Sequence, residues 1–144
     1  MDQNAADFIK SRELAIVGVS KRKFGGSIYR MLKQRGFTVY PIHPTLTAFD
    51  GDSCLPSLRD LPPGVDAAVI AVSPAHAENV VRDARSAGIK KLWFQQGADF
   101  REIALMAEAY GIKTVTRKCI LMYAGPVTGI HSVHRFLAKV FGKY

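Results

Sequence analysis

The chain of 144 residues has the length of one ordinary domain, and its 48% hydrophobic and 22% charged residues are typical of a soluble globular protein. No apolar run approaches the roughly 20 residues of a membrane span, and the N-terminus, MDQNAADFIK, lacks the apolar centre of a secretory signal peptide. The net charge of +8 favours an anionic partner, although solubility alone also accounts for such a charge. No linker or repeat divides the chain, so we expect a single domain over residues 1–144.

Helices and strands are predicted to alternate along this domain. Helical spacing of apolar residues predicts the helices, and continuous apolar runs predict central parallel strands that are covered on both faces. In chain order we expect a helix at 4–11, a strand at 14–18, a helix at 26–35, a strand at 37–42, a loop at 43–51, one helical turn within 54–64, a strand at 66–72, a helix at 75–87, a strand at 90–95, a helix at 100–110, a strand at 113–117 and an amphipathic helix at about 131–142. This alternation predicts an α/β fold, a single Rossmann-like doubly wound domain with a mainly parallel sheet.

Polar or turn-forming residues follow every predicted strand. Ligands of open α/β sheets bind beyond the carboxyl ends of the strands, so we expect these residues to converge on one crevice. Because strand ends are loops in all proteins and loops are polar, the first two ends are the most informative. The residues are Gly18, Val19 and Ser20, then His43 and Pro44, then Ser73 and Pro74, then Gln95, Gln96 and Gly97, and finally Arg117, Lys118 and Cys119.

The turn after the first strand comes close to a dinucleotide-binding fingerprint. The G-x-G-x-x-G pattern would place glycines at 18, 20 and 23, but this chain has Ser20 and Lys23 at the last two positions. A helix that begins near Gly26 directs free N–H groups and a partial positive charge at the turn, and glycines let a phosphate approach the backbone. The segment is either a pyrophosphate cradle or an exposed basic turn. The cradle would comprise Gly18, Val19, Ser20, Lys21, Arg22, Lys23, Gly25 and Gly26.

The end of the second strand distinguishes between cofactors. An NAD site places Asp or Glu there, about 20 residues after the glycines, to bind the ribose hydroxyls. This chain reads YPIHP at 40–44 and has no acidic residue before Asp50. It also lacks the arginine that an NADP site would favour. An NAD(P)-binding Rossmann protein is therefore the second choice.

Five segments carry a resemblance to a known family. They are AIVGVSKRKFGGSIYRMLKQRGFTVYPIHP, CLPSLRDLP, VDAAVIAVSP, KKLWFQQGA and TVTRKCI. In this order they resemble the CoA-binding domain family, a group of small Rossmann-like proteins related to the nucleotide-binding domain of the succinyl-CoA synthetase alpha subunit. The resemblance covers about residues 12–121 and implies CoA or an acyl-CoA as the ligand.

The resemblance also implies a role for each strand end. The Gly18–Ser20 turn and its basic residues would meet the CoA phosphates. The His43-Pro44 pair, where the family normally has Asn-Pro, would face the adenosine half. The remaining slot would be lined by Val72, Ser73, Pro74, Gln95, Gln96 and Gly97, with Cys119 near its floor.

Charge agrees with this ligand. CoA carries a pyrophosphate and a 3′-phosphate, about four negative charges near neutral pH. A basic turn beside a helix N-terminus complements such a group through charge-assisted hydrogen bonds. We expect Lys21 or Arg22 to hold the 3′-phosphate, which NAD does not have.

Catalytic residues are harder to identify than binding residues. A Cys119–His43 pair would make an activated nucleophile, but buried cysteines are commonly inert. Cys54 and Cys119 lack metal-ligand spacing and are expected to be reduced thiols in a cytoplasmic protein. Basic residues are scattered rather than interleaved with exposed aromatics, so we do not expect a nucleic-acid partner. We predict a binding module for a small nucleotide ligand, with an acyl-CoA enzyme as an alternative.

Overall fold

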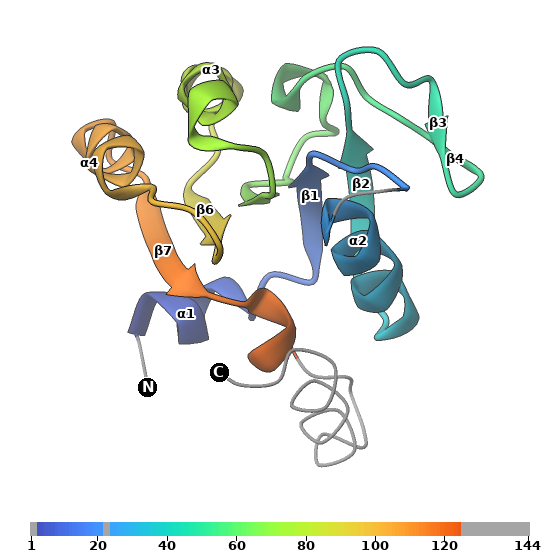
Figure 1. The fold of residues 1–144 in the computed structure, drawn as a ribbon, viewed down its shortest axis with the longest axis horizontal. Helices are drawn as coiled ribbons and strands as arrows, with labels where there is room; N and C mark the ends of the chain where they lie inside the picture. The colour runs from blue at the N-terminus through green and yellow to red at the C-terminus, as the bar shows by residue number, and fades with distance from the viewer. Residues whose placement is uncertain (1–2, 22–23, 125–144) are drawn as a thin grey trace.

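The computed structural model describes residues 3–21 and 24–124; the tail helix predicted at about 131–142 lies outside them. A five-stranded sheet has the order β2-β1-β5-β6-β7 (Figure 1). All four neighbouring pairs are parallel. This arrangement confirms the predicted α/β, Rossmann-like fold. The strands are β1 (Glu13–Val17), β2 (Thr38–Ile42), β5 (Ala67–Ile70), β6 (Lys91–Gln95) and β7 (Lys113–Lys118).

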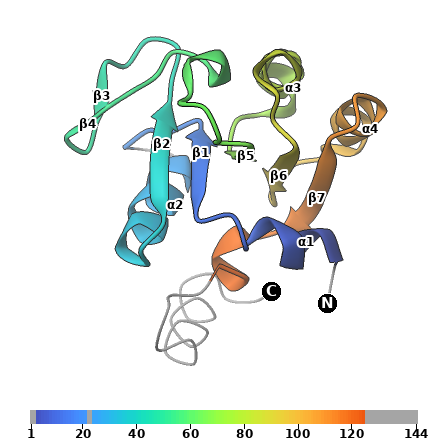
Figure 2. The same cartoon turned by 180° about the vertical axis from the view of Figure 1, so that it is seen from behind.

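Helices cover both faces of the sheet (Figures 1 and 2). One face packs against α1 (Gln3–Phe8), α2 (Phe24–Gln34) and the short 3₁₀ helix η2 (Ile120–Met122). The other packs against α3 (Pro74–Ala87), α4 (Arg101–Ala109) and the 3₁₀ helix η1 (Leu58–Asp60). Among the described residues, no helix is long and apolar enough to cross a bilayer.

Alternating side chains of the central strands supply both cores. In β1, Leu14 and Ile16 point to the α2 face, while Ala15 and Val17 point to the α3 face. All four residues of β5 are buried, as expected of a strand that is covered on both sides. Sheet geometry therefore makes the continuous apolar runs of the sequence into two separate packed layers.

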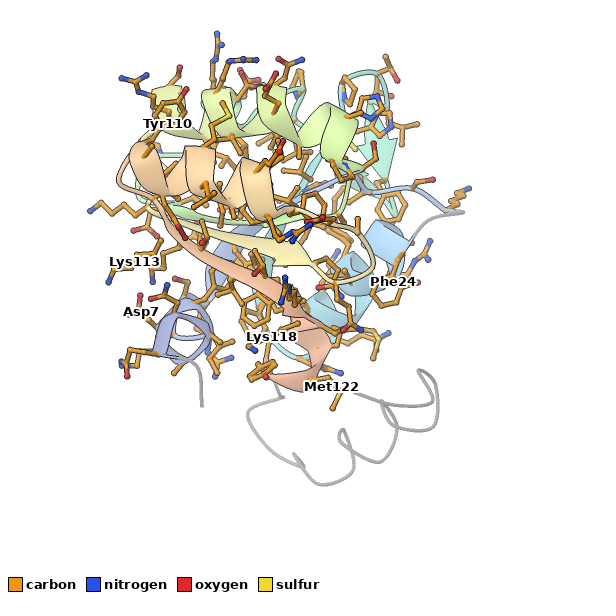
Figure 3. The ribbon with its side chains drawn as sticks, turned by 60° about the vertical axis from the view of Figure 1, so that its left-hand side comes forward. Asp7, Phe24, Tyr110, Lys113, Lys118 and Met122 are labelled. Carbon is orange, nitrogen blue, oxygen red and sulfur yellow. The ribbon has the colours of Figure 1, made fainter. Side chains whose placement is uncertain are left out.

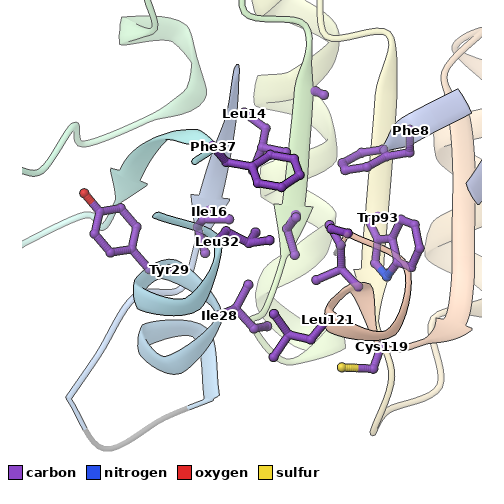
Figure 4. Packing of buried hydrophobic residues seen from close by; sticks show 14 of the residues in the cluster. Phe8, Leu14, Ile16, Ile28, Tyr29, Leu32, Phe37, Trp93, Cys119 and Leu121 are labelled. Carbon is purple, nitrogen blue, oxygen red and sulfur yellow. The ribbon is translucent and has the colours of Figure 1, made fainter. Parts of the chain in front are cut away.

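Trp93 belongs to the core on the α2 face and lies beside Phe8 at one side of it (Figure 4). It is 0% exposed, its ring packs edge-on against Phe8 at 5.4 Å, and its Nε1 donates a hydrogen bond to the Lys118 carbonyl. Beside it, α1 is anchored to the far edge of the sheet by polar contacts. Asp7 Oδ2 lies 4.0 Å from Lys113 Nζ (Figure 3). Asn4 Nδ2 donates a hydrogen bond to the Thr114 carbonyl. These contacts fix the N-terminal helix under β6 and β7.

The segment predicted as a loop at 43–51 leads into a small antiparallel hairpin. Its strands are β3 (Ala48–Phe49) and β4 (Asp52–Ser53). The two turn residues, Asp50 and Gly51, have φ values of 54° and 85°, as a type I′ turn requires. Asp-Gly is the strongest short signal for a hairpin, so Asp50-Gly51 predicts this turn from the sequence, although the segment was predicted as a loop.

The hairpin is fastened to α2 by aromatic and charged contacts. The Tyr29 hydroxyl donates a hydrogen bond to Asp52, and Lys33 Nζ lies 2.6 Å from the same carboxylate. The rings of Tyr29 and Phe49 meet edge-on at 5.4 Å. Burial and the neighbouring Asp52 raise the pKa of Tyr29, so its hydroxyl remains a hydrogen-bond donor. The hairpin thus lies firmly beside the loop that leaves β2.

Candidate functional site

A cleft of about 530 Å³ opens at the carboxyl end of the sheet, around the ends of β1, β2 and β5. The chain order reverses at β1, which has β2 on one side and β5 on the other. Such a switch point is where open α/β sheets bind ligands, and the volume lies within the range of small-molecule sites. The lining residues are Val17, Gly18, Val19, Ser20, Ile42, His43, Pro44, Pro56, Ser57, Leu58, Ala71, Val72, Ser73, His76, Asn79, Val80 and Asp83.

Glycines shape the turn between β1 and α2. Gly18 has a φ of +102°, and a Cβ there would lie 2.8 Å from the Ala71 carbonyl oxygen. A Cβ on Gly25 would lie 2.3 Å from the Gly18 carbonyl oxygen, and one on Gly26 would lie 2.2 Å from the Ser20 carbonyl oxygen. The missing side chains therefore let the first turn of α2 pack directly on the backbone of the turn, the close approach that a dinucleotide-type turn needs.

Ser20 and Lys21 lie at the open side of this turn. Ser20 is half-buried and lines the cleft, while Lys21 is exposed. Arg22 and Lys23 lie outside the described residues. Because α2 begins at Phe24 rather than near residue 26, its positive N-terminal end follows the turn directly.

His43 closes the loop that follows β2. Its Nδ1 accepts hydrogen bonds from the backbone N–H groups of Thr45, at 3.1 Å, and Leu46, at 2.9 Å. These two donors assign the ring proton to Nε2. An Asn or Asp side chain closes turns in the same way, by accepting a backbone N–H two residues ahead. The imidazole of His43 therefore provides an acceptor of the kind that an Asn side chain provides in such turns.

One side of α3 forms the opposite wall of the cleft. Ser73 is the N-cap residue of α3, and Pro74 occupies the first helical position. The Ser73 Oγ does not cap the helix but lies 2.8 Å from His76 Nδ1. Further along the helix, Asp83 accepts a hydrogen bond from Ser57 Oγ and forms an ion pair with Arg59. The cleft thus has an acidic group on the α3 side and basic Lys21 near its turn.

The other predicted site residues lie elsewhere. Gly97 lines a second cavity of about 440 Å³, together with Arg101 and Arg117. The Gln95 side chain is buried, and its Oε1 accepts a hydrogen bond from the Ile120 N–H. Gln96 is exposed and its backbone N–H bonds to the Lys118 carbonyl. Cys119 belongs to the core on the α2 face. The structure therefore divides the five strand ends between the cleft, a second cavity and the core.

A Cys119–His43 pair is not formed in this fold. His43 follows β2 and Cys119 follows β7, and these strands are the two opposite edges of the sheet. Four strand spacings of roughly 4.8 Å separate them by about 19 Å, far beyond hydrogen-bond reach. Burial raises the pKa of the Cys119 thiol, which makes it a weaker nucleophile at neutral pH.

Several cleft residues were not singled out from the sequence. Ser57 lies in the helical turn expected within 54–64, and Asn79 and Asp83 lie in the helix expected at 75–87, but none of the three is among the predicted site residues. Their signal is the spacing of His76, Asn79, Val80 and Asp83, which repeats every three to four residues and marks one side of a helix. No three or more His, Cys, Asp or Glu side chains gather as metal ligands within residues 3–21 and 24–124.

Comparison with known proteins agrees with this fold. The chain is 30% identical over 121 residues to an ADP-forming acetate–CoA ligase of Archaeoglobus fulgidus; the match covers 76% of the chain and 18% of the ligase. A conserved hypothetical protein from Pyrococcus furiosus is 40% identical, with a TM-score of 0.71 over 76% of this chain and 96% of that one.

A dinucleotide forming acetyl-coenzyme A synthetase from Ca. Korarchaeum cryptofilum, solved with phosphate and ADP, is 30% identical, with a TM-score of 0.69 over 85% of this chain and 28% of that one. The chain spans about a fifth of the length of three curated acetate–CoA ligases that it matches. The CoA binding domain family matches residues 12–124, which is most of the chain. The protein belongs to the CoA-binding domain family.

Proposed function

We propose that the protein binds CoA or an acyl-CoA in the cleft at the ends of β1, β2 and β5, with the phosphates against the β1–α2 turn. The observation that carries this proposal is the turn itself. Gly18 lets the chain turn sharply, Gly25 and Gly26 bring α2 onto it, Ser20 lines the cleft, and the exposed Lys21 follows Ser20 in the chain. A helix N-terminus beside a basic turn is a favourable environment for a pyrophosphate.

The family and the charge of the chain support CoA in particular. CoA presents about four negative charges, and the segment Lys21–Lys23 supplies three positive ones. Charge-assisted hydrogen bonds from such residues are roughly twice as strong as neutral ones. The named ligases that the chain resembles are CoA enzymes, although the chain covers only 18% of the Archaeoglobus one.

NAD(P) is the competing ligand. The end of β2 carries His43 rather than a carboxylate, and the His43 Nδ1 is engaged by the loop backbone. An NAD site needs an acidic side chain at this position to hold the ribose hydroxyls. We therefore place NAD(P) second.

Binding is the function that we propose, and we assign no reaction to it. The hydrogen bond between Ser73 and His76 joins residues three apart at the start of one helix, and it positions them relative to α3. Cys54 and Cys119 are both free thiols, which suits the reducing cytoplasm where we place the protein. Hydrolysis of acetyl-CoA that His43→Ala or Cys119→Ser abolished would instead assign an acyl-CoA reaction.

Calorimetric titration with CoA, acetyl-CoA, NAD, NADP and ATP tests the proposal. We expect CoA or acetyl-CoA to bind most tightly, and tighter binding of NAD would refute the proposal. Lys21→Ala should weaken CoA binding, because it removes a cation beside the turn. Lys90→Ala is the matched control, since Lys90 is exposed and directly precedes β6, at the amino ends of the strands rather than at the carboxyl ends where the cleft lies.

A further inference from the structure

The α3 wall of the cleft contains a carboxylate that the phosphate site does not use. Asp83 lies ten residues after Ser73, which places it about 15 Å along the helix from the strand end. Both residues line the cleft. Phosphates are repelled by a carboxylate, whereas a hydrogen-bond donor is attracted to it, so the ligand group that suits Asp83 is a donor and not a phosphate.

Asp83 is held in place by its neighbours and still has accepting capacity. Ser57 Oγ donates to its Oδ2 at 3.2 Å, and Arg59 Nη2 lies 3.1 Å from its Oδ1. The Asp83 side chain remains 30% exposed. A carboxylate has about four lone-pair sites, and the two contacts occupy only two of them. A ligand donor can therefore bind to Asp83 without displacing either partner.

The surroundings of Asp83 suit a flat, mostly apolar ring. Ile42, Pro44, Leu58 and Val80 line the same cleft and supply aliphatic surface. Purine faces pack well on such surface, while the edge of the ring needs a polar partner. Carboxylates are natural acceptors for the exocyclic amino groups of bases.

We infer that Asp83 recognises the base of the bound nucleotide by accepting a hydrogen bond from the 6-amino group of adenine. This inference rests on the proposed CoA site and adds a specificity-determining residue to it. Asp83 then selects adenine over a 6-oxo purine bound in the same orientation. In the 6-oxo purine a carbonyl oxygen would face the Asp83 carboxylate, and the two oxygens repel each other. Asp83 also sets the direction of the ligand, with the base at α3 and the phosphates at the β1–α2 turn.

The test compares CoA with its hypoxanthine analogue, in which a 6-oxo group replaces the 6-amino group. Calorimetry should show that the native protein prefers CoA about ten- to a hundredfold, the range of one charge-assisted hydrogen bond. Asp83→Asn should bring the two ligands within about threefold, because an amide both accepts and donates. Asp60→Asn removes the same charge outside the cleft and should keep the native preference.

The outcomes separate this inference from the function on which it rests. If CoA binds the native protein and Asp83→Asn keeps the native preference, Asp83 does not read the base, although the CoA site stands. If the native protein binds neither ligand, the proposed function falls and the inference falls with it. Asp83→Ala provides a second variant: it should lower CoA affinity to that of the analogue, and unchanged discrimination in this variant would equally overturn the inference.

Discussion

The strand ends at the two sides of the sheet serve different purposes. At β1, β2 and β5 the turns remain open, and Gly18, His43 and Ser73 surround a cleft. At β6 and β7 two of the corresponding residues, Gln95 and Cys119, are buried, while Gln96, Gly97 and Arg117 are exposed. Gln95 Oε1 accepts a hydrogen bond from the Ile120 N–H, and Cys119 is only 3% exposed. Polar residues after an apolar strand therefore mark either a binding site or a buried support of the fold.

The path of the following chain explains this difference. α2 and α3 leave β1 and β5 toward opposite faces of the sheet, and this divergence opens a crevice between the two strands. After β7 the chain instead enters η2, which packs on the α2 face. The buried Arg35 guanidinium donates to the carbonyls of Leu121 and Ala124, at 3.0 Å each, and holds this segment down. A strand end lines the cleft only where the chain segment that follows the strand leaves this end uncovered.

The largest effect is expected at the open end, from replacing Lys21, Arg22 and Lys23 together by Ala. Each lost charged hydrogen bond should cost about 1.5–3 kcal/mol of CoA binding, or about ten- to a hundredfold in Kd. Stability should hardly change, because an exposed turn buries little apolar surface. Calorimetry and urea denaturation measure the two quantities. Unchanged CoA affinity at physiological salt would show that these residues form only a solvated turn.

A second effect should appear in the packing of the β1–α2 turn. Gly26→Ala places a Cβ 2.2 Å from the Ser20 carbonyl oxygen, so backbone must move. We expect a loss of about 2–3 kcal/mol of unfolding free energy, as for overpacked cores. Urea denaturation measures this loss, and Ser27→Ala, at an exposed position of the same helix, is the control. Native stability of Gly26→Ala would contradict the close approach of α2 to the turn.

At the covered end, Gln95→Ala should reduce stability without affecting the ligand. The substitution leaves the buried Ile120 N–H without an acceptor, at a cost of about 1–3 kcal/mol. The Kd for CoA should stay within about twofold of the native value. Weaker CoA binding at native stability would contradict this prediction. It would show that Gln95 contacts the ligand, which is the role that the family resemblance implies.

The smallest effect concerns the two thiols. Burial raises the pKa of both Cys54 and Cys119, so a smaller fraction of each thiol is thiolate at neutral pH. Alkylation at neutral pH should therefore be slower than for a fully exposed cysteine, and it should speed up as the pH rises. Half-buried Cys54 should react before buried Cys119. Iodoacetamide labelling followed by mass spectrometry gives the order. Rapid labelling of Cys119 that CoA prevented would place this thiol in the ligand slot.

Short-range patterns were sufficient for most of the elements. Apolar spacing predicts both ends of α2, α3 and α4 to within two residues. Gly88 ends α3 with a φ of 76°, a left-handed conformation that favours glycine. The hairpin at β3 and β4 was missed because its strands have two residues each. Its Asp50-Gly51 turn was the only local signal available.

The sequence by itself determined the alternation of strands and helices, the glycine turn after β1 and the basic residues that follow it. These features depend on residues close together in the chain, through backbone sterics, helix and strand periodicity and local charge. Only the tertiary structure decided that Asp83 faces the cleft while Cys119 enters the core. Both outcomes depend on which strands become neighbours and which face each connection covers, and these are contacts between residues far apart in the chain.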